Sequence, residues 1–236
     1  MQTKKPELPV LSIDALGDPE LYGLLIVDKA QGWSSFDVVK RLRRLSGIKK
    51  IGHAGTLDPM ATGLLICLLG SKATRAQDAW MNEDKVYTGV MRFGQTTDSY
   101  DAETPIHEER ILPANFEEAL FQALPLFSGD ITQEVPIYSA VKKGGKRLYR
   151  YARAGEEVTL PKRNVTIKRF TATMINDTDA SFEVACSKGT YIRSLAHELG
   201  QHLGVGAHLI ALRRTMIGNL SVAEASRLDQ ETTSMD

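Results

Sequence analysis

The most informative stretch of the sequence is Gly52-His53-Ala54-Gly55-Thr56-Leu57-Asp58-Pro59-Met60-Ala61-Thr62-Gly63. Three glycines and one proline among these twelve residues are typical of a loop. Pro59 favours extended backbone geometry at Asp58, and the glycines allow another chain to approach closely, so the carboxylate can face an open cleft. Asp followed by Pro is also a common start of a helix, and taken alone these residues favour that helix cap.

The segments around this loop have the patterns of buried strands and an amphipathic helix. The apolar run 64–69 after the loop is predicted to be a buried strand, and so is the run 24–27 upstream. Apolar residues recur at helical spacing over 36–45, with Ser34 or Ser35 as the N-cap. The other face of this helix is basic, with Lys40, Arg41, Arg43 and Arg44.

The rest of the chain mixes strand and helix patterns without a regular βαβ repeat. One helix is predicted over 116–124, with Asn115 and Glu118 as a capping pair, and another over 195–203, with Gly204 just after its end. Strand patterns, in which apolar and polar residues alternate, cover 86–93, 165–168 and 182–186. Several strands with only three clear helices predict an α+β fold.

Length and charge place the chain among ordinary globular proteins with segregated charge. Its 236 residues suffice for one large domain or two small ones, and its net charge is zero. Residues 29–50 hold seven Lys/Arg against one Asp, a net charge of +6, whereas 98–134 hold nine Asp/Glu against one Arg, a net charge of −8. Residues 135–214 hold fourteen Lys/Arg against six Asp/Glu, a net charge of +8. A basic face for phosphates can therefore coexist with an acidic face, although such runs are also typical of ordinary solvated surfaces.

Several other classes of protein are disfavoured. Cys67 and Cys186 belong to no CxxC pattern, so neither a disulfide framework nor a zinc site is indicated, and a reducing cytoplasm is expected. Residues 1–9 lack an apolar signal core and no run is long enough for a bilayer, so we expect neither secretion nor membrane insertion. The two histidines of the stretch 197–202 are five residues apart instead of four, which argues against a zinc helix.

The loop motif and its neighbours resemble one known family. GHAGTLDPMATGLL (52–65) is similar to the catalytic-loop motif of the TruB family of tRNA pseudouridine synthases, which act on the T-loop uridine at tRNA position 55. The resemblance covers roughly residues 22–220 in the same order, which a chance match to one short pattern would not give. The further matching stretches are 23–39, 84–103, 138–158, 186–200 and 206–214.

The resemblance implies roles for particular residues. Asp58 matches the family's essential aspartate, Tyr87 its active-site tyrosine and Arg193 the arginine that pairs with the aspartate. It also implies a pseudouridine-synthase fold, with a mixed, mainly antiparallel sheet, flanking helices and a central RNA-binding cleft, and neither a metal nor a cofactor. Substrate-binding positions are matched by Tyr191 and Leu212, in the uracil pocket, and by Lys29 and His53, which contact or frame the RNA.

These residue types suit the isomerisation of uridine. The reaction breaks the N-glycosidic bond, turns the base over and joins C5 to C1′, so it needs an ionised carboxylate at the sugar or base. A bidentate pair with Arg193 would keep Asp58 ionised and oriented. Tyr87 offers a stacking face for a flipped base and a hydroxyl for proton transfer at C5. Taken singly, each of these residues is more often structural, and only their joint occurrence in ordered motifs favours catalysis.

A basic insert at about 135–152 is predicted to grip RNA. Glycines at 144 and 145 suggest a mobile finger, and its tyrosines can stack on bases while its cations neutralise phosphates. A solvated hairpin is the alternative interpretation. The predicted RNA-contacting residues are Lys142, Lys143, Lys146, Arg147 and Arg150.

The sequence also predicts the organisation of the chain and leaves two other functions open. We expect an irregular lead-in at 1–21, one catalytic domain at 22–220 and a frayed tail at 221–236, without the PUA-type RNA-binding domain of longer family members. The expected partner is the T-arm of tRNA, with no obligate protein partner and a monomeric state. A non-catalytic tRNA-binding or folding module and a nucleoside hydrolase are the alternative functions.

Overall fold

The structure is a computed structural model that describes residues 7–18 and 20–228, and the chain forms two compact units. The first unit comprises Met1–Lys85 and Arg213–Asp236, and the second comprises Val86–Leu212. The sequence predicted a single catalytic domain over 22–220, so this division is a finding of the structure. The boundary falls inside two strands, β4 (Lys85–Phe93) and β12 (Ala207–Ile217).

The first unit is built on three antiparallel strands, two of which are connected by the Asp58 loop. Strands β1 (Gly23–Lys29) and β3 (Thr62–Leu69) pair antiparallel over their whole length, and β2 (Ile51–Ala54) pairs antiparallel with β3. The loop therefore connects two neighbouring antiparallel strands. The helices of this unit are η1 (Ile13–Ala15), α1 (Ser35–Ser46), α2 (Gly70–Thr74), α3 (Gln77–Met81) and η3 (Val222–Glu224).

Helix α1 begins and ends as its sequence predicts. Ser34 is the N-cap, and Ser34 and Asp37 form a reciprocal capping box in which each backbone N–H donates to the other side chain. Gly47 closes the helix in the left-handed conformation, at a φ of 70°. Residues Val38, Val39 and Leu42 are buried on the inner face, as the helical spacing requires.

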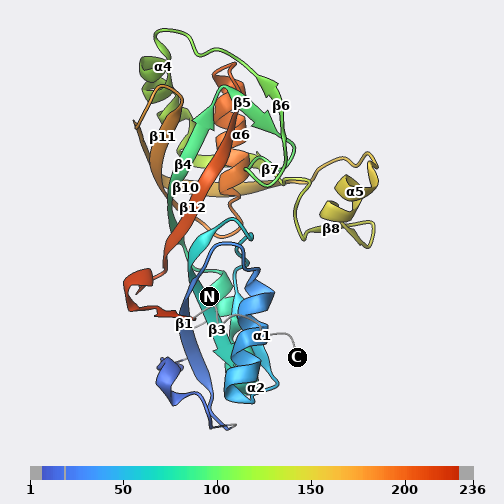
Figure 1. The fold of residues 1–236 in the computed structure, drawn as a ribbon, viewed down its shortest axis with the longest axis vertical. Coiled ribbons are helices and arrows are strands. Elements are labelled where there is room, and N and C mark those ends of the chain that lie inside the picture. The colour runs from blue at the N-terminus through green and yellow to red at the C-terminus, as the bar shows by residue number, and fades with distance from the viewer. Residues whose placement is uncertain (1–6, 19, 229–236) are drawn as a thin grey trace, which may run out of the picture. The chain divides into compact units, whose positions relative to one another are not determined.

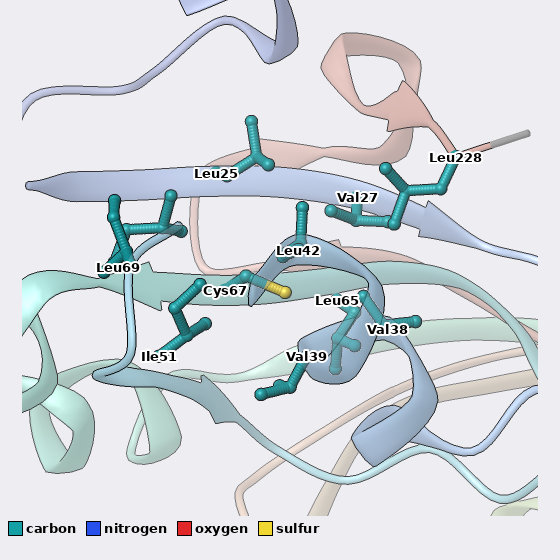
Figure 2. Close-up of a cluster of buried hydrophobic side chains, with 11 residues drawn as sticks. Leu25, Val27, Val38, Val39, Leu42, Ile51, Leu65, Cys67, Leu69 and Leu228 are labelled. Carbon is teal, nitrogen blue, oxygen red and sulfur yellow. The ribbon is translucent and has the colours of Figure 1, made fainter. Parts of the chain in front are cut away.

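The core of the first unit lies on both faces of β3. Figure 2 shows Val38, Val39 and Leu42 of α1 directed toward Leu65 and Cys67 of β3. Alternate residues of β3 pack into a second cluster with Ala54, Trp80 and Ile217 on the opposite face. Both faces of β3 are covered, which explains why the run 64–69 is continuously apolar and shows no alternation. The buried strand predicted at 64–69 is confirmed.

The C-terminal segment corrects one expectation. Residues 221–228, assigned from the sequence to a frayed tail, contribute strand residues and a 3-10 helix to the first unit. Strand β14 (Ser226–Arg227) pairs parallel with β1, and β13 (Leu220–Ser221) pairs antiparallel with β12. Leu228 is buried in the core cluster beside α1. The remainder of the expected tail, 229–236, lies outside the described residues.

The second unit is a mixed α+β layer whose strands are hydrogen-bonded in the order β12-β4-β11-β10-β7. The long strand β10 pairs antiparallel with β11 on one side and with β7 on the other. Both predicted strands at 165–168 and 182–186 are confirmed, although β10 is much longer than its pattern indicated. The strands are β5 (Gln95–Thr97), β6 (Ile106–Glu109), β7 (Gly129–Glu134), β10 (Lys162–Met174) and β11 (Asp179–Cys186).

The helices of the second unit match two predictions, and one predicted cap is wrong. Helix α4 (Phe116–Ala123) follows Asn115, but the Asn115 side chain makes no capping hydrogen bond. Helix α6 (Ile192–His202) ends just before Gly204, which has a φ of +73°, as expected for the residue after a helix. A 3-10 turn, η2 (Leu124–Phe127), extends α4 through Pro125.

The basic insert has regular secondary structure, and its predicted mobility as a finger stays a prediction. It consists of a short hairpin, β8 (Lys142–Lys143) and β9 (Lys146–Arg147), followed by α5 (Leu148–Ala154). Figure 1 shows β8 and α5 standing apart from the sheet of the second unit. Among the described residues, no helix is long and apolar enough to cross a membrane.

Candidate active site

Asp58 lies in a turn, so the helix cap favoured by its local sequence is wrong. Residues 58–61 form a turn closed by the Ala61 N–H, which donates to the Asp58 carbonyl oxygen at 3.1 Å. No helix follows Pro59; strand β3 starts at Thr62 instead. The Asp58 side chain belongs to a half-buried residue between buried Leu57 and exposed Pro59.

Side-chain and backbone hydrogen bonds hold the residues on both sides of Asp58. The buried Ser35 hydroxyl accepts from the Leu57 N–H at 2.9 Å and donates to the Leu57 carbonyl at 3.2 Å. The Gly32 N–H donates to the Pro59 carbonyl at 2.8 Å. The residues before and after Asp58 are therefore fixed by the start of α1 and the loop that precedes it, which gives the carboxylate a preorganised backbone.

Lys29 lies beneath the same loop. Its side chain is 1% exposed, and its ammonium group donates to the carbonyls of Ala30, Trp33 and Pro59. A buried lysine at the end of an apolar strand joins two loops by satisfying their carbonyl oxygens. These hydrogen bonds make Lys29 part of the loop's support, and its expected contact with RNA stays a prediction.

Arg214 is the structural residue that the sequence interpretation missed. It is 1% exposed; its Nε donates to the Leu64 carbonyl at 2.7 Å and its Nη2 to the Gly55 carbonyl at 2.9 Å. Gly55 has a φ of +83°, and a Cβ there would lie 3.3 Å from Nη1 of Arg214. The guanidinium thus ties both ends of the Asp58 loop together. The available signal was a charged pair, Arg213-Arg214, directly after the mainly apolar run 207–212.

A second charged pair lies next to this support. Arg213 donates to both carboxylate oxygens of Asp28 at 2.9 Å, a bidentate geometry. Arg227 of β14 lies 3.6 Å from the same carboxylate. Asp28, on β1, therefore links β12 and β14 to its own strand.

His53 lies on β2, which leads into the loop. Burial lowers the pKa of His53, and the nearby Arg214 cation lowers it further. Its Nδ1 is buried and has no hydrogen-bond partner among the described residues. The ring is thus held neutral at neutral pH, while its expected contact with RNA stays a prediction.

The other predicted site residues belong to the second unit. Arg193 is 4% exposed; its Nη1 donates to the Ser99 carbonyl at 2.9 Å and its Nη2 to the Tyr138 carbonyl at 3.0 Å. Its Nε lies 3.5 Å from Oδ2 of the fully buried Asp101. All three nitrogens of the guanidinium therefore lie near oxygen atoms of the second unit. The contact with Asp101 was not predicted from the sequence.

Tyr87, Tyr191 and Leu212 have different surroundings. Tyr87 on β4 and Leu212 on β12 are each 8% exposed, so both are largely buried. Tyr191 is the N-cap of α6, and its backbone exchanges two hydrogen bonds with the Gln133 side chain, at 2.7 and 2.9 Å. The guanidinium of Arg163 lies 5.2 Å from the centre of the Tyr191 ring.

The predicted residues are thus divided between the two units. Lys29, His53 and Asp58 belong to the first, and the other four belong to the second. The pairing of Arg193 with Asp58 stays a prediction. No group of three or more potential metal ligands occurs among the residues that the structure describes.

The basic insert carries internal contacts as well as exposed cations. Lys146 pairs with Glu156 at 2.7 Å, and its ammonium group lies 4.5 Å from the centre of the Tyr151 ring. The Tyr151 hydroxyl donates to the Lys143 carbonyl at 3.0 Å. Lys146 therefore stabilises the insert, whereas the Arg147 and Arg150 side chains belong to exposed residues.

Comparisons with known proteins identify the family. Residues 43–192 match the profile of the N-terminal domain of TruB family pseudouridylate synthases, and 193–233 match that of the tRNA pseudouridylate synthase B C-terminal domain. The chain is 48% identical over 216 residues to tRNA pseudouridine synthase B of Thermobifida fusca, covering 88% of this chain and 73% of that protein. It is 46% identical over 210 residues to tRNA pseudouridine synthase B of Opitutus terrae, covering 89% and 87%.

A solved structure agrees with the fold. The chain superposes on a protein in the crystal structure of a Cbf5-Nop10-Gar1 complex with a TM-score of 0.67 and 28% identity. The match covers 94% of this chain and 57% of the length of that one. The α+β pseudouridine-synthase fold predicted from the sequence is therefore confirmed. The protein belongs to the TruB family of pseudouridylate synthases.

Proposed function

We propose that this protein isomerises uridine to pseudouridine in tRNA, at position 55 of the T loop. The observation that carries the proposal is the fixed Asp58 loop, which Ser35, Lys29 and Arg214 hold through backbone groups on both sides of the carboxylate. The curated relatives named tRNA pseudouridine synthase B support the reaction and the class of substrate. The enzyme is an isomerase, because the product has the atoms of the substrate.

The chemistry assigns distinct tasks to the proposed catalytic groups. The bond from C1′ to N1 breaks, a bond from C1′ to C5 forms, C5 loses its proton and N1 gains one. Asp58 is the carboxylate that acts on the sugar or base, and Arg193 keeps it oriented. A rigid backbone matters here because a misplacement of about 1 Å can cost on the order of 10²-fold in rate.

Tyr87 receives the extruded base in this proposal. A uridine in a folded loop must leave its stack before its C5 can reach a carboxylate. The ring of a largely buried tyrosine offers a stacking face, and its hydroxyl can take part in the proton transfer at C5. Tyr191 and Leu212 would then enclose the uracil ring.

The exposed cations of the insert would bind the phosphates of the T-arm. Arg147 and Arg150 lie on exposed positions of β9 and α5, next to Tyr149. Cations beside aromatic rings suit a folded RNA, whose backbone needs neutralising and whose loop bases can stack. The basic outer face of α1 adds a second patch of the same charge.

A T-arm stem-loop transcript with a single target uridine tests the proposal. The parent protein should convert that uridine to pseudouridine, and Asp58→Asn should bind the RNA with unchanged affinity but give no product. Asp177→Asn, at an exposed position of the β10–β11 turn, is the matched control and should remain active. Free uracil as the product would instead indicate a hydrolase, and binding without product from the parent would indicate a non-catalytic module.

A further inference from the structure

A cavity of about 410 Å³ lies within the second unit, apart from the residues assigned to the uracil pocket. Its volume falls in the range of roughly 300–1,000 Å³ that is usual for sites of small organic ligands. Three parts of the unit contribute to it: the segment around β5 and β6, the insert, and α6. Its principal side chains are Asp98, Tyr100, His107, Tyr138 and His197.

Tyr100 is held in a strained conformation at the wall of this cavity. It is the one residue other than glycine with a positive φ among the described residues, at +62°. Its N–H donates to the Thr97 carbonyl at 3.2 Å, and its carbonyl accepts from the Leu209 N–H at 3.0 Å, so the backbone is fixed on both sides. Strain of this kind persists where the surroundings enforce it, and it is concentrated at functional sites.

The Tyr100 ring stacks on His197, with a centroid distance of 3.8 Å and an interplanar angle of 14°. Two parallel rings form a flat platform of the kind on which nucleobases stack. The Nδ1 of His197 is buried and has no hydrogen-bond partner among the described residues. A buried polar atom without a partner is rare in native proteins and calls for an explanation, such as a ligand.

The charges around the cavity select the class of ligand. Within the described part of the chain, no lysine or arginine lines the cavity, and Asp98 contributes a carboxylate, which disfavours a phosphate. Burial lowers the pKa of His197, and the nearby His107 lowers it further, so the His197 ring is neutral at neutral pH and offers one donor and one acceptor. The site therefore suits a flat, uncharged heterocycle with hydrogen-bonding edges.

We propose that this cavity binds a second, unpaired nucleobase of the RNA substrate, separate from the uridine that is isomerised. The proposal rests on the proposed function, since it takes its ligand from the same RNA. Tyr138 connects the cavity to the site residues, because it lines the cavity and its carbonyl accepts from Arg193. His197 also lies four residues after Arg193 on α6, on the same face of that helix. A base in the cavity would thus help to fix Tyr138, whose carbonyl oxygen accepts from Arg193.

The test uses a set of T-arm stem-loop RNAs in which one loop nucleotide other than the target is replaced by an abasic residue. All proteins carry Asp58→Asn, so that the RNA is bound without conversion, and affinities are measured by fluorescence anisotropy. We expect the protein that retains His197 to bind one of the abasic RNAs at least about fivefold more weakly than the unmodified RNA. This factor corresponds to the lower end of the free energy that stacking of one base contributes. His197→Leu should bind the unmodified RNA about fivefold more weakly than the parent does. Its affinity should not fall further when the RNA carries the abasic residue at that position.

Two further variants separate the loss of the ligand from the loss of the fold. His197→Asn places an amide near the position of Nδ1 and should recover part of the affinity and the response to that abasic position. His202→Leu changes an exposed histidine of the same helix and should behave like the parent. Should His197→Leu not fold, Tyr100→Gly relieves the strained φ, removes the platform and allows the same comparison.

The inference is overturned if His197→Leu binds the unmodified RNA as tightly as the parent, or if its affinity falls by one common factor on every RNA in the set. Activity of the protein that retains Asp58 is measured separately on the unmodified RNA. A response confined to one abasic position, together with a failure to form pseudouridine, would reject the proposed reaction and still support the second base site.

Discussion

Arg214 donates from Nη2 to the carbonyl oxygen of Gly55 at 2.9 Å, three residues before Asp58. Its Nε donates to the Leu64 carbonyl, so one guanidinium holds the chain before and after the Asp58 turn. Both carbonyls accept from a side chain that is 1% exposed, where water cannot replace a lost partner. Arg214 is therefore a positioning residue for the loop, acting through its backbone.

Replacing Arg214 with methionine should destabilise the protein and slow the reaction. Two carbonyls would lose their donor, at about 1–3 kcal/mol each, so the free energy of unfolding should fall by roughly 2–6 kcal/mol in urea titrations. In single-turnover assays under conditions where the variant is folded, the rate should fall while RNA affinity is retained. Arg169→Met, at an exposed position of β10, is the control. An unchanged rate in folded Arg214→Met would contradict the positioning role.

Replacing Arg193 with lysine should remove most activity although the charge is retained. The guanidinium donates to the Ser99 and Tyr138 carbonyls and lies 3.5 Å from Asp101, an arrangement that a single ammonium group cannot reproduce. We expect kcat to fall by on the order of 10²-fold, comparable to the loss of one preorganised group, with a smaller change in KM. Pseudouridine formation measured over a range of RNA concentrations separates the two parameters. A variant with nearly normal kcat would show that charge alone is sufficient.

The strands and helices of the chain were largely predictable, because periodicity reports burial directly. The spacing over 36–45 is typical of an amphipathic helix, and the short, continuously apolar run 64–69 is consistent with a buried strand. The turn at Asp58 was not predictable locally, since Asp-Pro fits a helix start equally well. The turn depends on the support from Ser35, Lys29 and Arg214, all of which are distant from Asp58 in sequence.

The local structure of the insert was not predictable for a related reason. In the sequence, the glycines at 144 and 145 served only as a sign of mobility, whereas in the structure both adopt positive φ in a hairpin turn that cross-strand pairing stabilises. Contacts of Lys146 with Glu156 and Tyr151 then fix the hairpin against the following chain. Composition does not reveal such contacts, whereas a resemblance over a long, ordered set of motifs revealed the family.

The stability of the protein should fall as the pH drops below about 6.5, and His208 should contribute to this fall. His208 is 3% exposed, and burial lowers its pKa below the ordinary value of about 6.5. The unfolded state therefore binds more protons than the folded state in this range, so the free energy of unfolding decreases as the pH decreases. His208→Asn should reduce the loss of stability between pH 7 and pH 5, measured by urea unfolding at both values.

The control for this experiment is His202→Asn, which changes an exposed histidine on α6. It should leave the difference in stability between the two pH values as it is in the parent. An equal effect of both substitutions would contradict the assignment of the pH dependence to the buried ring.

The cations of the insert should contribute unequally to RNA binding. Arg147→Ala and Arg150→Ala remove exposed charges, so each should weaken tRNA binding and lower the slope of log K against log salt by about 0.7–0.9. Lys146 is already paired with Glu156, so Lys146→Ala should change the slope less and should mainly loosen the hairpin. Affinities measured between 50 and 200 mM salt, roughly the range over which such contacts are screened, provide the slopes. Charge reversal at both Lys146 and Arg147 should weaken binding further, and unchanged affinity would reject an RNA contact.

Replacing Ser35 with alanine should separate the geometry of the Asp58 loop from the binding of RNA. The Ser35 hydroxyl accepts from the N–H and donates to the carbonyl of Leu57, directly before Asp58. Its removal leaves a buried N–H without an acceptor, which costs about 1–3 kcal/mol of stability and allows the turn to shift. Because no charge and no exposed surface change, RNA affinity should stay the same while the single-turnover rate falls. Ser46→Ala, in the buried last turn of α1, removes a hydroxyl bonded to the Leu42 carbonyl and should lower stability without lowering the rate. Equal rates for the two variants would mean that the turn keeps its geometry without Ser35.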